Sequence, residues 1–159
     1  GLLEDFADRY PRARWRNTVL SGAGGLGKSF LLNCVYERVS SRGLPALRTT
    51  AYRMFDAMRK RHMGDDGGAD AFAALLEVPL LLVDDLGTEP LMRNITVEYL
   101  FLLLNERMEA GLSTMVTTNL TPAQIQERYG ERVCSRLFDR LSALTIKLEG
   151  KDLRLHGIR

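Results

Sequence analysis

The sequence contains little cysteine and no long apolar run. Its two cysteines, Cys34 and Cys134, lie far apart and share no metal-ligand spacing. A disulfide framework is therefore excluded, and we expect a reducing, cytoplasmic compartment. The apolar run from Val78 to Val83 is far too short to cross a bilayer, and the N-terminus has no signal-peptide pattern. We therefore expect no membrane partner.

Lysine is also scarce, and charge of one sign does not dominate. Only four of the 22 basic residues are lysines, and 20 acidic residues leave a net charge of +2. This balance excludes a surface that is basic throughout, although a local basic patch remains possible. At 159 residues, with 45% hydrophobic and 26% charged residues, the chain has the length and composition of one globular domain. It begins with Gly1 rather than Met, so we expect a fragment of a longer protein.

Short apolar runs alternate with segments of helical periodicity along the whole chain. Such alternation predicts a parallel sheet with helices on both faces, which is an α/β fold. A helix should also open at Thr121-Pro122, with threonine as its cap. The other predicted helices are 28–41, 51–62, 69–77, 95–110 and 131–142, and the predicted strands are 17–21, 45–49, 79–83, 113–118 and 144–148.

A glycine-rich phosphate loop follows the first predicted strand. Its pattern is G-x-x-x-x-G-K-S, and it opens a helix whose positive end can face an anion. Lys28 is expected to reach the outer phosphates of ATP or ADP, and the Ser29 hydroxyl to ligate Mg²⁺. A glycine-rich turn that binds nothing is the alternative. The predicted nucleotide-binding residues are Gly22, Ala23, Gly24, Gly25, Leu26, Gly27, Lys28, Ser29 and Phe30.

Two carboxylates end the apolar strand 79–83. In a phosphate-loop protein, Asp84 is expected to hold Mg²⁺, mostly through water, and Asp85 to orient or deprotonate the attacking water. Alone, the pair reads as turn-forming aspartates before Gly87. The phosphate loop about 55 residues upstream favours a catalytic site.

Polar and basic residues follow the fourth strand. Asn119 stands where strand ends line the ligand crevice, so it is expected to contact the γ-phosphate or the attacking water, besides starting a turn. Arg132, Arg136 and Arg140 recur every four residues and should share one face of the helix 131–142. They form either a solvated charged face or the source of an arginine finger for a neighbouring subunit, and spacing does not decide between these.

Taken together, these strings resemble the ATPase domain of the DnaC/DnaI-type helicase loaders, which belong to the AAA+ class. The resemblance covers nearly the whole chain. The Asp-Asp-Leu-Gly and Glu-Arg-x-x-Ser-Arg-Leu strings are far more specific than the phosphate loop. The matching segments are 22–31, 83–89, 117–120, 129–137 and 150–154.

The resemblance implies a three-layer P-loop NTPase fold, which is an AAA+ core with a parallel five-stranded sheet. It also implies an ATPase activity. It implies that Asp84 and Asp85 are the magnesium and water-activating pair, that Asn119 is the sensor and that Arg136 is the arginine finger. Subunits would then associate head-to-tail, and ATP hydrolysis would be slow in a lone subunit. We expect two departures from the pattern: no separate N-terminal domain of the kind with which loaders usually grip the replicative helicase, and no C-terminal helical lid of the kind that many AAA+ proteins have.

Loaders of this kind hold single-stranded DNA. The candidate contacts here lie in the segment 52–62, which mixes aromatic with basic residues, namely Arg53, Arg59, Lys60 and Arg61. A plain amphipathic helix with Phe55 and Met58 in the core is an equal alternative. The basic run 9–16 is expected to border the adenine instead.

Three other functions remain open. A transposase-helper ATPase of the same clade would act on duplex DNA. A small-molecule kinase would need an acceptor site and a closing lid, and the sequence indicates neither. A DNA-binding module that uses ATP only as a structural ligand would show no hydrolysis.

Overall fold

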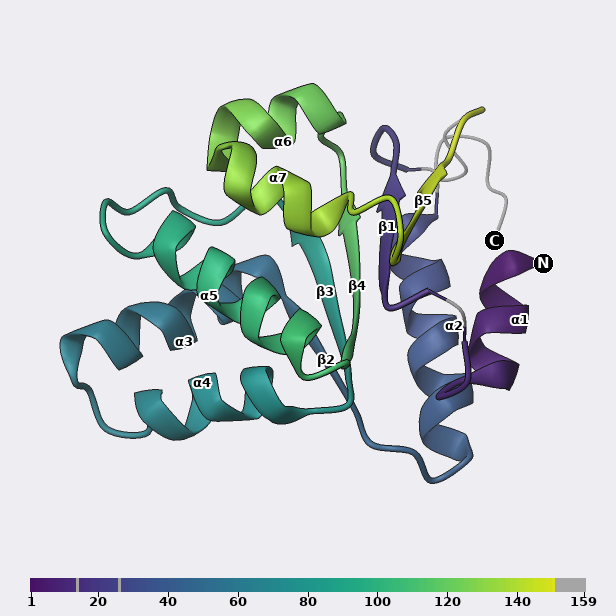
Figure 1. The fold of residues 1–159 in the computed structure, drawn as a ribbon, viewed down its shortest axis with the longest axis horizontal. Helices are drawn as coiled ribbons and strands as arrows, with labels where there is room; N and C mark the ends of the chain where they lie inside the picture. Colours follow the sequence, from purple (N-terminus) through teal and green to yellow (C-terminus); the bar gives the residue numbers. More distant parts are fainter. Residues whose placement is uncertain (14, 26, 151–159) are drawn as a thin grey trace.

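The computed structural model describes residues 1–13, 15–25 and 27–150, and its centre is a five-stranded parallel sheet (Figure 1). The strand order is β2-β3-β4-β1-β5. All pairings are parallel, so the carboxyl ends of the strands share one edge. The strands are β1 (Asn17–Ser21), β2 (Ala46–Thr50), β3 (Leu80–Leu86), β4 (Ser113–Thr118) and β5 (Ala143–Lys147).

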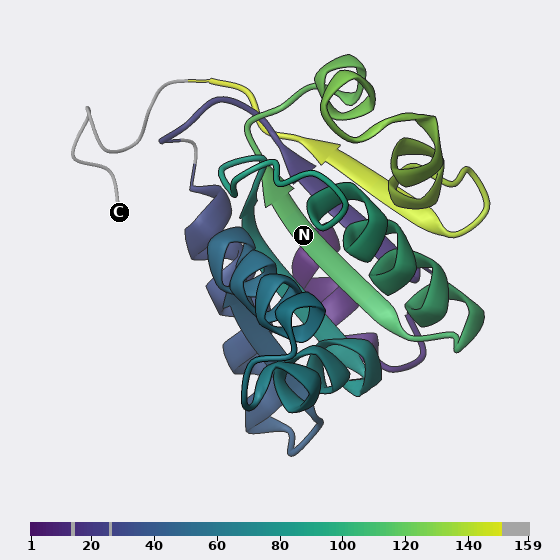
Figure 2. The same cartoon turned by 90° about the vertical axis from the view of Figure 1, so that its left-hand side faces the viewer.

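Helices cover both faces of this sheet and make it the middle of three layers (Figures 1 and 2). One face packs on α1 (Leu2–Arg9) and α2 (Lys28–Ser41). The strands are apolar throughout because side chains alternate between two buried faces: Leu80 and Leu82 join the cluster under α1 and α2, whereas Leu81 and Val83 join the other one. The opposite layer holds α3 (Ala51–Met63), α4 (Gly68–Glu77), α5 (Thr96–Glu109), α6 (Pro122–Tyr129) and α7 (Glu131–Leu137).

The predicted fold class is confirmed, and three elements differ from the predicted ones by more than one residue at an end. Helix α1 was not predicted; it docks through Phe6 and Ala7, which are buried against α2. Strand β3 runs on to Leu86 through a bulge. The predicted helix 131–142 is wrong beyond Leu137, because Asp139 accepts hydrogen bonds from the main chain and hydroxyl of Ser142 and so forms a turn.

The described part of the chain contains no helix that is long and apolar enough to cross a membrane. After β5, residues 148–150 form no helix. The residues that follow, among them Arg154 of the family-like string, lie outside the described residues.

A buried arginine on α5 joins the end of α4 to the beginnings of β3 and β4. Arg107 in the last turn of α5 is 1% exposed. Its guanidinium donates to the carbonyls of Leu75 (2.9 Å), Val78 (2.6 Å) and Ser113 (2.7 Å) and to the Thr114 hydroxyl (2.8 Å). Burial lowers the pKa of Arg107 to about 10, so the side chain remains charged at neutral pH.

The Arg107→Leu variant is expected to lose at least ~3 kcal/mol of unfolding free energy, because several buried acceptors lose their donor. Urea denaturation measures this loss. Arg38→Ala is the matched control: Arg38 pairs with Asp8 on the surface, where an ion pair contributes at most about 1 kcal/mol. Equal unfolding midpoints for the two variants would contradict the structural role of Arg107.

Candidate nucleotide-binding site

The phosphate loop joins the end of β1 to the start of α2, at the edge where the strand carboxyl ends meet. Gly25 (φ 82°) and Gly27 (φ 85°) have left-handed backbone conformations, which other residues rarely adopt, so this loop shape requires glycine. The Lys28 ammonium lies inside the loop and donates to the carbonyls of Gly22 and Ala23, each at 2.8 Å. Leu26 of the predicted set lies outside the described residues.

The two carboxylates at the end of β3 are separated by the bulge. Pairing with β4 shifts between Val83 and Leu86, and Asp85 has a left-handed backbone (φ 60°). Asp84 is therefore buried, whereas Asp85 is exposed. The pKa of Asp85 is raised, mainly by partial desolvation and then by the neighbouring Asp84 charge, and Lys28 opposes the rise.

Asp84 connects the phosphate loop with the next strand. Its Oδ1 atom accepts from the Ser29 hydroxyl at 2.9 Å and from the Thr117 hydroxyl at 2.5 Å. The Thr117 oxygen also accepts from the main-chain N–H of Asp85 at 2.8 Å. Lys28, Ser29, Asp84 and Asp85 thus lie near one another at this edge of the sheet.

Two contributors to this cluster were missed by the sequence analysis. Thr117 is fully buried in β4, and its role follows from the pairing of β4 with β3, which no local pattern shows. Arg48 in β2 places its Nη2 atom 4.0 Å from the second oxygen of Asp84. Thr117 opens the family-like segment 117–120, and this was the sequence signal that pointed toward it.

Asn119 and Phe30 lie beside the same loop. Asn119 directly follows Thr118, which pairs with Ser21, the residue before the loop, and Asn119 is exposed. Phe30 in the first turn of α2 is 65% exposed, which is unusual for a large apolar side chain. Both residues lie at the edge where the sequence analysis expected them.

Arg136 is not part of this cluster. Its main-chain oxygen accepts from Asn17 at the beginning of β1, and the phosphate loop follows the other end of that strand, roughly 13 Å away along five residues. The Arg136 guanidinium donates to Asn105 on α5 at 3.0 Å, with its Cζ atom 5.5 Å from the Phe101 ring centroid. The residue therefore faces away from the nucleotide site of its own chain.

The predicted three-arginine stripe is only partly correct. Arg132 lies over the same Phe101 ring, with its Cζ atom 3.8 Å from the centroid. Arg140 lies beyond the end of α7, so it does not share a helix face with the other two. One aromatic ring therefore supports two arginines, Arg132 and Arg136.

The basic residues of α3 differ in their surroundings. Phe55 and Met58 are buried, so the helix is amphipathic with a core face. Arg59 and Lys60 both pair with Asp56, at 3.0 and 3.2 Å. Arg53 and Arg61 are exposed, and within the described ranges neither has a carboxylate within ion-pairing distance. In the run 9–16, Arg9 pairs with Asp5 at 2.8 Å on α1.

The chain resembles known proteins over almost its whole length. The chain is 22% identical over 163 residues to the replicative helicase loader DnaI of Bacillus subtilis, covering 96% of this chain and 52% of that protein. It therefore spans about half the length of this curated relative. Among solved structures, the DnaC helicase loader superimposes with a TM-score of 0.79 at 20% identity, covering 92% of this chain and 86% of that one.

A replication initiator has the same core. AMPPCP-bound DnaA from Aquifex aeolicus superimposes with a TM-score of 0.73 at 18% identity, covering 99% of this chain and 51% of that one. These structural likenesses establish the AAA+ type of α/β fold. The model of the family described as IstB-like ATP binding protein matches residues 10–157. The chain therefore belongs to the family of IstB-like ATP-binding proteins, and it resembles the helicase loaders DnaI and DnaC.

Proposed function

We propose that this domain hydrolyses Mg-ATP as the ATPase domain of a helicase loader, which helps to deposit the replicative helicase in DNA replication. The observation that carries the proposal is the hydrogen-bonded set of Ser29, Asp84 and Thr117 beside a phosphate loop of ATP-binding type. Likeness to the loader DnaI supports the assignment to replication. In this proposal the site binds ATP or ADP in the cytoplasm, and the replicative helicase is gripped by a separate domain.

Nucleotide binding is assigned to the loop 22–27 with Lys28, Ser29 and Phe30. Main-chain N–H groups of the loop and the positive end of α2 attract the phosphates, and Lys28 exchanges its loop carbonyls for phosphate oxygens. Within the described ranges, no group of three or more His, Cys, Asp or Glu side chains is arranged so that it could hold a metal ion. The hydroxyl of Ser29 and the carboxylate of Asp84 nevertheless fit Mg²⁺, which commonly takes one or two protein oxygens and completes its shell with phosphate and water.

Hydrolysis requires a residue that activates water, a residue that contacts the γ-phosphate, and an arginine supplied from outside the subunit. When bound, Mg²⁺ would neutralise charge that develops on the phosphate oxygens. We assign Asp85 to orient or deprotonate the attacking water, and Asn119 to contact the γ-phosphate. Because Arg136 faces away from its own site, we assign it to the site of the next subunit in a head-to-tail assembly.

Thr117→Val is expected to lower the turnover number for ATP roughly 10- to 100-fold. Valine has the same shape but donates no hydrogen bond to Asp84 and accepts none from the N–H of Asp85, so both aspartates lose their shared support. Thr117→Ser keeps the hydroxyl and should retain turnover. A Thr117→Val variant with normal turnover would show that Thr117 does not position the aspartates.

Single-stranded DNA is assigned to the exposed basic side of α3, with Arg53 and Arg61 as principal contacts and Arg59 and Lys60 as weaker ones, because Asp56 already engages the latter two. Fluorescence anisotropy with labelled single strands in Mg-ATP tests this. The double variant Arg53→Ala/Arg61→Ala should reduce the salt dependence of affinity by about 1.4 in log–log slope, at about 0.7 per phosphate contact. Arg9→Ala, on the opposite layer, is the control. An unchanged slope would remove α3 from the DNA interface.

One second candidate is a transposase-helper ATPase of the same clade, which would act on duplex DNA and use the same ATP-binding domain. The same titration separates the two functions. A loader should prefer the single strand in the presence of ATP, whereas a transposase helper should prefer the duplex. Duplex preference would replace the loader proposal and leave the ATP site unchanged.

A further inference from the structure

A buried carboxylate lies outside the nucleotide cluster and joins two segments that are far apart in sequence. Glu89, three residues after the end of β3, is 2% exposed. Its Oε2 atom accepts from the N–H of Gly87 at 2.8 Å, and its Oε1 atom accepts from the hydroxyl of Tyr129 at the end of α6. Its main-chain oxygen accepts from the Arg128 guanidinium, which is 3.9 Å from its carboxylate.

Packing alone does not require an acid at this position. Burial of a carboxylate costs several kcal/mol unless its oxygens are paired, and an apolar side chain would fill the same space without that cost. Both oxygens of Glu89 have donors, one from each segment. Burial and the neighbouring Glu89 charge raise the pKa of Tyr129, so its hydroxyl remains a neutral donor at every physiological pH.

One end of this connection is the catalytic turn. The Asp85 carbonyl accepts from the hydroxyl of Thr88 at 2.8 Å and from its N–H at 3.2 Å, so the turn 85–88 is closed on itself. Gly87 lies against Leu120, and a Cβ atom at Gly87 would come within 2.7 Å of that side chain. The turn therefore has little freedom to move independently of Glu89.

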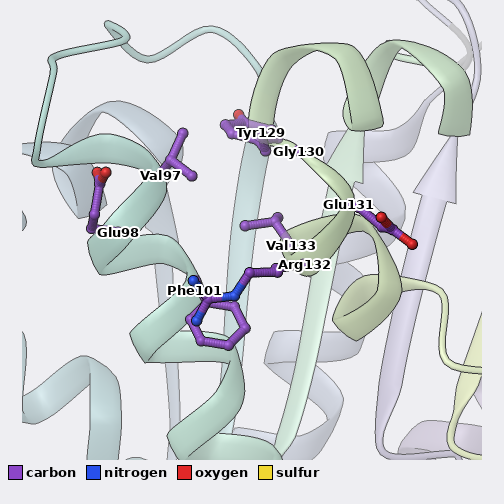
Figure 3. Close-up of a pocket in the computed structure, with 8 residues that line it drawn as sticks. All are labelled: Val97, Glu98, Phe101, Tyr129, Gly130, Glu131, Arg132 and Val133. Carbon is purple, nitrogen blue, oxygen red and sulfur yellow. The ribbon is translucent and has the colours of Figure 1, made fainter.

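The other end is the helix that carries the arginines. Gly130 follows Tyr129 and is the N-cap of α7. Figure 3 shows Tyr129, Gly130 and Glu131 leading into α7, with the Arg132 guanidinium lying on the Phe101 ring. These residues line a pocket of about 320 Å³ between α5 and α7. A shift of Tyr129 would therefore move the beginning of α7.

We propose that Glu89 is a positioning residue that links the Asp85 turn to the start of α7, so that nucleotide bound in one subunit sets the position of the arginines offered to the next. This inference rests on the proposed function. A link of this kind acts in both directions: the same side chain supports hydrolysis within its own subunit and arginine donation to the neighbour.

Mixed assemblies test the two directions separately. An Asp85→Asn subunit can donate Arg136 but cannot hydrolyse, and an Arg136→Ala subunit can hydrolyse but cannot donate. The mixture should recover ATP turnover that neither variant shows alone. Glu89→Gln replaces one of the two accepting oxygens by an NH2 group, which donates and cannot accept. We expect this change to lower the recovered rate about tenfold when it is placed in either subunit.

The link would be overturned if the recovered rate fell only when Glu89→Gln was in the hydrolysing subunit. It would also be overturned if the rate fell with Glu89→Gln in neither subunit. Failure of the parent mixture would instead overturn the arginine assignment under the proposed function.

Hydrogen exchange in separate subunits then still tests the link. A non-hydrolysable ATP analogue with Mg²⁺ should change the protection of the α7 amides 131–137, and Glu89→Gln or Tyr129→Phe should abolish that change. Tyr99→Phe, a tyrosine on α5 hydrogen-bonded to His62, is the matched control. The link would be overturned if the ATP analogue still changed the protection of the α7 amides in both the Glu89→Gln and the Tyr129→Phe variants.

Discussion

Arg136→Ala is expected to abolish ATP turnover while nucleotide affinity stays at its original value. An arginine that reaches the transferred phosphoryl group from a neighbouring subunit contributes about 10³- to 10⁵-fold to the turnover number in other phosphate-loop enzymes. Here the Arg136 main chain is fixed at the beginning of β1, and the phosphate loop follows the end of that strand. Removal of the side chain therefore leaves the binding site of its own subunit intact.

Two variants make the Arg136 result specific. Arg136→Lys keeps the charge and loses the planar fork, so it should restore little turnover. Arg132→Ala removes the other arginine from the Phe101 ring and should retain most of the activity. Steady-state hydrolysis and equilibrium binding of a fluorescent ATP analogue measure the two quantities. Normal turnover in Arg136→Ala would remove this residue from the catalytic site.

The Lys28→Ala variant is expected to bind ATP roughly 10- to 100-fold more weakly, since a hydrogen bond to a charged group contributes about 1.5–3 kcal/mol. The Lys28 side chain is 6% exposed and lies within the phosphate loop. Isothermal titration with Mg-ATP measures the change, and thermal unfolding without nucleotide checks that the loop carbonyls tolerate the loss of their donor.

Lys60→Ala is the matched control for Lys28, because Lys60 lies on α3 and pairs with Asp56. Its affinity for ATP should equal that of the unchanged chain. Equal affinities in Lys28→Ala and Lys60→Ala would contradict the assignment of the loop 22–29 to phosphate binding.

Sequence was sufficient for features whose signal is local. The phosphate loop and α2 are contiguous, and the run 80–83 is apolar because both faces of β3 are buried. The alternation of strands and helices predicted the parallel sheet, and the topology then brought Ser29 to Asp84 across 55 residues. The shared edge of parallel strands explains why this long-range contact was predictable.

Features that depend on tertiary partners were not predictable. Thr117 acquires its role from β3 on the neighbouring strand, Glu89 from Tyr129 forty residues later, and Arg107 from the carbonyls at the end of α4. The end of α7 was predicted wrongly because the periodic arginines continue past Leu137, whereas the Asp139 side chain stops the helix. Polar side chains that bond the main chain locally outweigh periodicity at such positions.

The central claim is that a neighbouring subunit completes the nucleotide site. Its most direct test is the ATP hydrolysis rate per subunit, measured over a range of protein concentrations with and without single-stranded DNA. We expect the rate per subunit to rise with concentration and to rise further with DNA, because both favour the assembly that brings Arg136 to the next site. A rate that is independent of both would contradict a shared site.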